Sequence, residues 1–193
     1  MGYMNHAEPY SDDYLKDILS SVKTIAMVGA SPDKTKFSYG VLRVLSETGY
    51  DMIPVNPRPG LDEIRGLKVY PSLDAIDRPV DMVEVFRKPE DLPAIAEQAV
   101  AIGAKVLWGQ IGVYNENAAR IAEDAGMRVV MDRCPKIEFS RLYKELGWHG
   151  FNSGVTLRHS GLSHTLPLTA LDTKTRSSGS VAILKFNFRS GLE

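Results

Sequence analysis

The chain has 193 residues, 44% of them hydrophobic, and a formal net charge of −1 at pH 7. This size suits one globular domain with its own core, and the charge balance excludes the broad basic surface that DNA or RNA requires. Cys134 is the only cysteine, which excludes an intramolecular disulfide and a metal site built from a cysteine cluster. The sequence has no apolar run of ~20 residues and does not start like a signal peptide, so we expect a cytoplasmic protein that does not cross a membrane.

Apolar runs typical of buried strands alternate with helix-like runs along most of the chain. Strands are predicted at 24–28, 51–55, 80–86, 105–108 and 127–131. Helices are predicted at 11–22, 39–46, 89–102, 115–125 and 135–144, with Ser11 as an N-cap and Gly49 and Gly126 as helix ends. A short extended piece at 68–70 and a helical turn at 73–76 separate the second and third strands. Because helices separate strands that are apolar throughout, the pattern predicts a single three-layer α/β domain with a five-stranded, mostly parallel sheet.

The composition changes after Trp148. Residues 152–180 are rich in Ser, Thr, Gly and Leu without a sustained period, which is typical of an irregular chain. We therefore expect a domain at 1–154 and an irregular, flexible C-terminal tail at 155–193. Within this tail, 181–188 has the apolar character of a strand but no evident partner.

The segment 24–40, TIAMVGASPDKTKFSYG, reads as a buried strand that runs into a loop and then into a helix. Gly29 is at the carboxyl end of the strand, where a fold of this kind binds its ligand, and the small residues Ala30 and Ser31 let backbone N–H groups approach a phosphate. The usual dinucleotide glycine spacing is absent, since only Gly29 and Gly40 bracket the loop. The segment therefore predicts a phosphate-bearing nucleotide without identifying it; the alternative is an ordinary tight turn.

Four further side chains near this loop are candidates for the same site. Lys34 and Lys36 either meet a pyrophosphate or are ordinary exposed lysines. Ser38 either donates a hydrogen bond to the ligand or caps the helix. Tyr39 either stacks on a base or packs in the core.

The end of the second strand discriminates between nucleotides. NAD-binding folds usually place a carboxylate there for the ribose diol, whereas this chain has Asn56, Pro57 and Arg58. An arginine favours a phosphate monoester, which coenzyme A carries at the 3′ position of its ribose and NADP at the 2′ position. The alternative for Arg58 is an exposed loop residue, and the alternative for Asn56 is a residue that completes a turn.

The ends of the third and fourth strands supply the remaining candidates. Phe86 and Arg87 follow the third strand and are expected to reach the same crevice as Gly29. Trp108 and Gly109 end the fourth strand, where glycine permits a close approach of the backbone. The alternative for Trp108 is an aromatic residue of the core or its rim.

Catalytic machinery is hard to find in the sequence. None of the four histidines lies at a predicted strand end, and no Ser–His–acid set or metal-ligand spacing occurs. Cys134 precedes a predicted helix but has no base beside it in the sequence, so filling a turn is the better interpretation. Glu84, inside the third strand, needs a partner or a place at the edge of the sheet. The sequence therefore favours binding over catalysis.

Residues 20–154 resemble the small bacterial coenzyme A-binding proteins, which consist of a single Rossmann-like domain. The motifs that carry the resemblance are VGAS (28–31), PVNP (54–57), PSL (71–73), VD (80–81), WGQIG (108–112), DRCPK (132–136) and GWHG (147–150). The chain is also similar to the amino-terminal domain of the succinyl-coenzyme A synthetase alpha subunit. In that synthetase the phosphorylated histidine lies in a second domain with no counterpart here, so the resemblance does not imply its activity.

The resemblance implies that the segment from Gly29 to Ser31, together with Lys34, lies at the adenosine and pyrophosphate end of the ligand. It further implies that Arg58 binds the ribose phosphate and that the segment from Leu107 to Gly109 lines the pocket. The complete set of residues predicted to bind the cofactor comes from the ends of four strands and the loops that follow them: Gly29, Ala30, Ser31, Lys34, Lys36, Ser38, Tyr39, Gly40, Asn56, Pro57, Arg58, Phe86, Arg87, Leu107, Trp108 and Gly109.

The leading hypothesis is a non-catalytic binding or regulatory module that holds coenzyme A or an acyl-CoA at the carboxyl edge of the sheet. One alternative is an NADP-dependent oxidoreductase, which shares the fold and the arginine but needs a substrate site and usually a proton donor. Another is a subunit that reports nucleotide status to an unidentified protein partner. No nucleic-acid or membrane partner is expected.

Overall fold

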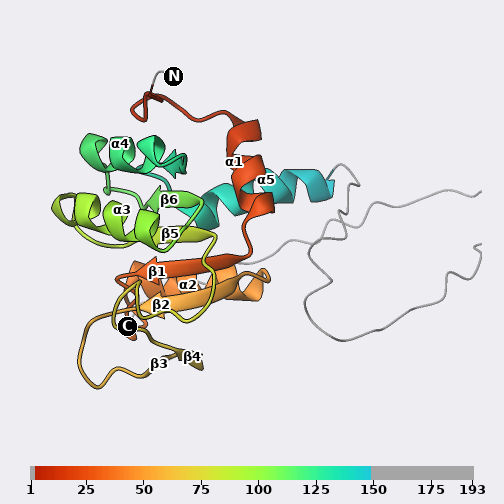
Figure 1. Ribbon diagram of the computed structural model, residues 1–193. Helices are drawn as coiled ribbons and strands as arrows, with labels where there is room; N and C mark the ends of the chain where they lie inside the picture. The colour runs from red at the N-terminus through yellow and green to blue at the C-terminus, as the bar shows by residue number, and fades with distance from the viewer. Residues whose placement is uncertain (1–2, 149–193) are drawn as a thin grey trace, which may run out of the picture. The chain divides into compact units, whose positions relative to one another are not determined.

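Five parallel strands form the sheet at the centre of the fold (Figure 1), and the computed structural model describes residues 3–148. In spatial order the strands are β2 (Asp51–Val55), β1 (Thr24–Val28), β5 (Met82–Val85), β6 (Val106–Gly109) and β7 (Arg128–Val130). Every neighbouring pair is parallel, so the predicted α/β fold is confirmed and its sheet is wholly parallel. The predicted tail at 155–193 lies outside the described residues.

Helices cover both faces of this sheet. Successive side chains of a strand point to opposite faces, so neighbouring residues of one strand belong to different cores. Leu107 belongs to a core with residues of α3 (Leu92–Ala101) and α4 (Glu116–Asp124). Its neighbour Trp108 belongs to a second core with residues of α1 (Asp12–Ser21), α2 (Phe37–Glu47) and α5 (Pro135–Trp148). Figure 1 shows α3 beside α4 and α1 beside α5. No helix in residues 3–148 combines the length and apolar character that a membrane span needs.

The predicted N-cap of α1 is confirmed, α4 has a side-chain cap that was not predicted, and α2 has none. The side chains of Ser11 and Asn115 accept hydrogen bonds from the N–H groups of Tyr14 and Ala118, which caps α1 and α4. A short 3₁₀ turn, η1 (Pro89–Asp91), precedes α3. Helix α2 begins two residues earlier than predicted, at Phe37, and has no side-chain cap. Its first turn therefore presents uncapped N–H groups.

A small antiparallel hairpin between β2 and β5 was not predicted. It consists of β3 (Glu63–Ile64) and β4 (Leu67–Lys68), joined by Arg65 and Gly66, both of which have positive φ. Arginine rarely signals such a turn, which explains why only the extended piece at 68–70 was expected. The Tyr70 N–H donates to Pro54 O at 3.0 Å and thereby ties this segment to β2. The predicted turn at 73–76 is present, with the Ile76 N–H donating to Leu73 O at 3.2 Å.

Candidate functional site

Gly29 joins the loops that follow three neighbouring strands. Its N–H donates to Val55 O at 2.9 Å, and the N–H of Phe86 donates to Val28 O at 2.8 Å. Gly29 has a φ of +87°, and a Cβ atom there would lie 2.6 Å from Phe86 O. Only glycine fits this close approach, because the conformation and the space both exclude a side chain. The carboxyl ends of β2, β1 and β5 therefore form one continuous edge.

Asn56 fixes the geometry of two loops at this edge. Its amide Nδ2 donates to Ala30 O at 2.7 Å, and its Oδ1 accepts the N–H of Arg58 at 2.9 Å. These bonds fulfil the turn-completing interpretation of Asn56. They leave Pro57 and Arg58 exposed at the rim, and no ion-pair partner of Arg58 occurs within residues 3–148.

The loop between β1 and α2 is organised by Asp33, which the sequence interpretation missed. Its Oδ1 accepts hydrogen bonds from the N–H and the hydroxyl of Thr35 at 2.9 and 2.8 Å, which lower the pKa of its carboxyl. The Asp33 N–H in turn donates to the Ser31 hydroxyl at 3.2 Å. This Asx turn keeps Lys34 and Lys36 exposed, and neither has an ion-pair partner in the described part of the chain.

The start of α2 offers backbone donors. Tyr39 N–H and Gly40 N–H both bond to Lys36 O, whereas residues 3–148 supply no acceptor for the N–H groups of Phe37 and Ser38. Ser38 is buried, so its side chain does not cap the helix from outside. The missed residue Phe37 is 89% exposed, which is unusual for a large aromatic side chain.

Three predicted residues at this edge make contacts with other protein residues. Tyr39 packs against the core, and the Arg65 guanidinium lies 5.4 Å from its ring centroid, so the core interpretation of Tyr39 fits the structure. Arg87 is exposed but pairs with Asp91, with an Nη2–Oδ2 distance of 3.0 Å. Phe86 is half-buried against the same core as Tyr39.

The side chains of Leu107 and Trp108 do not reach the edge. Both are fully buried, one in each core, and the Trp108 Nε1–H donates to Arg133 O at 2.7 Å. Burial on a central strand explains this correction, since the residues before a strand end belong to the core layers. Gly109 is different: a Cβ atom there would lie 2.4 Å from Val113 O, so its backbone is closely approached by protein. We leave Leu107 and Trp108 out of the candidate site.

Glu84 is fully buried at the centre of the sheet, in register with Met27 and Trp108. Its Oε1 accepts a hydrogen bond from Gln110 Nε2 at 3.2 Å, while Oε2 has no partner in the described part of the chain. Burial raises the pKa of Glu84 to about 8, and the bond from Gln110 opposes the shift. Gln110 also accepts the N–H of Ile111 at 2.9 Å, so this pair anchors the loop after β6.

The folded protein should therefore lose stability as the pH rises from about 5 to 8. In this range the unfolded chain has released the Glu84 proton and the folded chain retains it, so the free energy of unfolding falls by up to ~1.4 kcal/mol per pH unit. Glu84→Gln keeps the acceptor for Gln110 and removes the proton, so its stability relative to the wild type should increase with pH. Urea unfolding of both proteins at pH 5, 6.5 and 8 measures this, and parallel pH curves would contradict the assignment.

Comparison with known proteins identifies the relatives of the chain. Residues 23–140 match the family model of the CoA binding domain. The uncharacterized protein YneT of Bacillus subtilis (strain 168) is 42% identical over 123 residues, which are 64% of this chain and 90% of YneT. A solved structure of a hypothetical protein from Pyrococcus horikoshii OT3 is 38% identical with a TM-score of 0.68, covering 74% of this chain and 99% of that chain.

A larger relative shares the same region. The alpha subunit of ADP-forming acetate–CoA ligase I from Pyrococcus furiosus is 30% identical over 128 residues, but these are 59% of this chain and only 28% of that subunit. The match thus covers one part of the ligase and leaves most of it without a counterpart. The resemblance found in the sequence motifs is confirmed. Since the matched region spans more than half of the chain, the protein belongs to the coenzyme A-binding domain family.

Proposed function

We propose that this protein binds coenzyme A or an acyl-CoA at the carboxyl edge of its sheet. The observation that carries the proposal is that the N–H groups of Phe37 and Ser38, at the start of α2 on the segment that follows Gly29, have no acceptor within residues 3–148. A helix start of this kind attracts a phosphate through its N–H groups and its partial positive charge. The exposed side chains of Lys34 and Lys36 add positive charge to the same loop.

Arg58 is the proposed partner of the 3′-phosphate. Its backbone is fixed by Asn56, which also holds Ala30 in the first loop, so the arginine is anchored beside the phosphate-binding segment. Its side chain is exposed and carries no ion pair within residues 3–148, in contrast to Arg87, which is held by Asp91. A guanidinium binds a phosphate monoester through two parallel hydrogen bonds.

We propose a binding or regulatory role and assign no reaction to this site. None of the residues that we place in it is a histidine or a cysteine, and its one carboxylate, Asp33, is held by Thr35. A proton-transfer catalyst needs a group that is available to the reacting atoms. The NADP-dependent alternative shares Arg58, and titration with NADPH beside coenzyme A tests it directly.

Arg58→Ala should weaken coenzyme A binding about 10-fold and change dephospho-coenzyme A binding less than about 2-fold, because only the former has a charged partner for the guanidinium. Isothermal titration calorimetry of both ligands measures this. Arg43→Ala is the matched control, since Arg43 lies in α2 with a side chain that is 52% exposed and pairs with Glu47.

Equal losses for the two ligands would contradict the role of Arg58. No detectable binding of coenzyme A or acetyl-CoA to the wild type would contradict the proposed function itself. Tighter binding of NADPH than of coenzyme A would favour the oxidoreductase.

A further inference from the structure

Strand β7 lies at one edge of the sheet, and within residues 3–148 it pairs only with β6. Alternate residues of a parallel strand direct their N–H and C=O groups to opposite sides. The Arg128 N–H donates to Lys105 O on the side of β6, so Val129 and Met131 direct their groups outward. Outward groups of this kind are a template for pairing with another chain. Their hydrogen-bond partners therefore decide whether the sheet can be extended.

Two tyrosine hydroxyls occupy these outward groups. The Tyr14 hydroxyl accepts the Val129 N–H and donates to Val129 O, both at 3.1 Å. The Tyr10 hydroxyl accepts the Met131 N–H at 2.8 Å. Burial raises the pKa of Tyr10 to about 12 and raises that of Tyr14 as well, so both hydroxyls keep their protons at neutral pH. In an antiparallel pair a residue bonds to the same two groups of its opposite residue, so Tyr14 takes the place of a neighbouring strand.

Residues 3–14, which we call the strap, are held at a second place by the last turn of α4. His6 is buried, with Nδ1 2.8 Å from the Tyr10 hydroxyl oxygen and Nε2 3.2 Å from Glu123 Oε1. The Tyr3 hydroxyl donates to Asp124 Oδ1 at 2.8 Å. Figure 1 shows the strap running past α4 to the start of α1. The strap is therefore attached to α4 as well as to β7.

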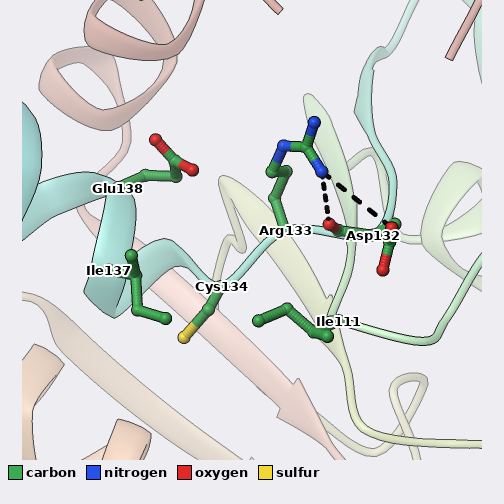
Figure 2. Close-up of a pocket in the computed structure, with 6 residues that line it drawn as sticks. All are labelled: Ile111, Asp132, Arg133, Cys134, Ile137 and Glu138. Atoms are coloured by element: carbon green, nitrogen blue, oxygen red, sulfur yellow. Dashed lines mark hydrogen bonds and ion pairs between the residues drawn. The ribbon is translucent and has the colours of Figure 1, made fainter. Parts of the chain in front are cut away.

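Arg133 holds the ring of Tyr10 from the loop after β7. Its guanidinium carbon lies 5.8 Å from the ring centroid of Tyr10, and Nη1 donates to Asp132 O at 2.9 Å. Figure 2 shows the Arg133 side chain extending away from Cys134, beside a pocket of about 350 Å³. The rings of Tyr10 and Tyr14 are also stacked, with centroids 5.8 Å apart and planes at 12°. These contacts orient the two hydroxyls toward the strand.

The opposite edge of the sheet, at β2, is closed in a different way. Pro54 lies on β2 and has no N–H to donate. Its carbonyl accepts the Tyr70 N–H at 3.0 Å, so a segment of the same chain lies along this edge. Both edges are thus blocked by the chain itself. Natural proteins block the edges of their sheets because an open edge pairs with the edge of another copy.

We infer that the strap closes the β7 edge against a second copy of this chain, and that two copies without it pair β7 with β7. The partner is a second copy because every copy presents the same edge, and an antiparallel pair of identical strands is self-complementary about a two-fold axis. An axis at Val129 lets each copy bond the N–H and C=O that Tyr14 otherwise occupies. This inference does not depend on the proposed function.

The double variant Tyr10→Ala, Tyr14→Ala removes both rings and both hydroxyls from the edge. Sedimentation velocity over a roughly 100-fold range of protein concentration should show a single chain for the wild type and a growing fraction of dimer for the variant. The matched control is Tyr50→Ala, Tyr143→Ala. These two tyrosines pack in the same core, and their hydroxyls donate to carbonyls of α1 rather than of a strand. The control should stay a single chain.

Hydrogen exchange of single amides, followed by NMR, locates the contact. In dilute solution the amides of Val129 and Met131 should exchange at least about 10-fold faster in the double alanine variant, because their acceptors are gone. At high protein concentration the Val129 amide should regain protection, since the second copy supplies a carbonyl. Protection that returns without any dependence on concentration would come from the same chain and would overturn the inference.

Three results of sedimentation would also overturn it. The first is a double alanine variant that stays a single chain throughout. The second is a dimer in which Val129 remains unprotected, because the copies then meet through another surface. The third is a wild type that dimerises as readily as the variant. If the alanine variant does not fold, Tyr10→Phe, Tyr14→Phe decides in its place: it keeps the rings and loses the hydroxyls, so we expect the same faster exchange and a weaker association. Absence of either result in that variant would overturn the inference.

Discussion

Trp108→Ala should lower the free energy of unfolding by about 3–5 kcal/mol, which is a large part of the stability of a domain of this size. Trp108 is among the largest side chains of the fold that are fully buried, and β6 is paired on both sides by β5 and β7. The truncation leaves a cavity between the sheet and its helices. It also removes the indole donor of Arg133 O, which holds the loop after β7.

Urea unfolding followed by circular dichroism measures this loss, and an unchanged slope with denaturant shows that the unfolded state is comparable. Trp108→Phe separates the two contributions, because it fills most of the volume and lacks the donor; we expect a loss of about 1–3 kcal/mol. A cost below about 1 kcal/mol for Trp108→Ala would mean that the residue is not part of the core.

Gly29→Ala should cost about 2–4 kcal/mol of stability and weaken coenzyme A binding roughly 100-fold. The added Cβ would lie 2.6 Å from Phe86 O, which is backbone and not a flexible side chain. The ends of β1 and β5 must therefore move apart, and the loop that leads to the N–H groups of Phe37 and Ser38 moves with them. Two backbone donors to phosphate contribute about 1.5–3 kcal/mol each, which is the source of the expected loss in affinity.

Gly49→Ala is the matched control for the backbone conformation. Gly49 has a φ of +99° but no atom within 4 Å of its ideal Cβ, and it lies at the opposite end of α2 from Phe37. It should cost only about 1–2 kcal/mol and leave coenzyme A binding unchanged. Thermal melting and calorimetry of both variants provide the comparison. Equal stability of Gly29→Ala and Gly49→Ala would show that the close approach at Phe86 is unimportant.

The sheet was predictable because its strands are buried on both faces. Residues 24–28 and 51–55 have the predicted bounds of β1 and β2, since a run that is apolar throughout needs no knowledge of its neighbours. The end of β5 and the start of α2 were misplaced by one or two residues. These limits depend on hydrogen bonds with other segments, such as that from Phe86 N–H to Val28 O, which a sequence does not display.

The sequence predicted the close backbone approach at the candidate site better than it predicted the contacts of the side chains there. The position of Gly29 after a buried strand indicates a close approach, and the structure supplies its partner, Phe86 O. For Asn56, Tyr39 and Trp108 the two interpretations were equally compatible with the sequence. The structure adds their contacts with Ala30, Arg65 and Arg133, and each of these partners is distant in the chain.

By itself the sequence determined the parallel α/β architecture and the family, because these depend on local periodicity and short motifs. Only the tertiary structure decided which side chains are available at the carboxyl edge of the sheet, which residues form the hairpin, and that Ile111, Cys134 and Ile137 share one pocket. The physical reason is that burial and side-chain contact arise between segments far apart in the chain, so their outcome depends on packing that no local pattern encodes.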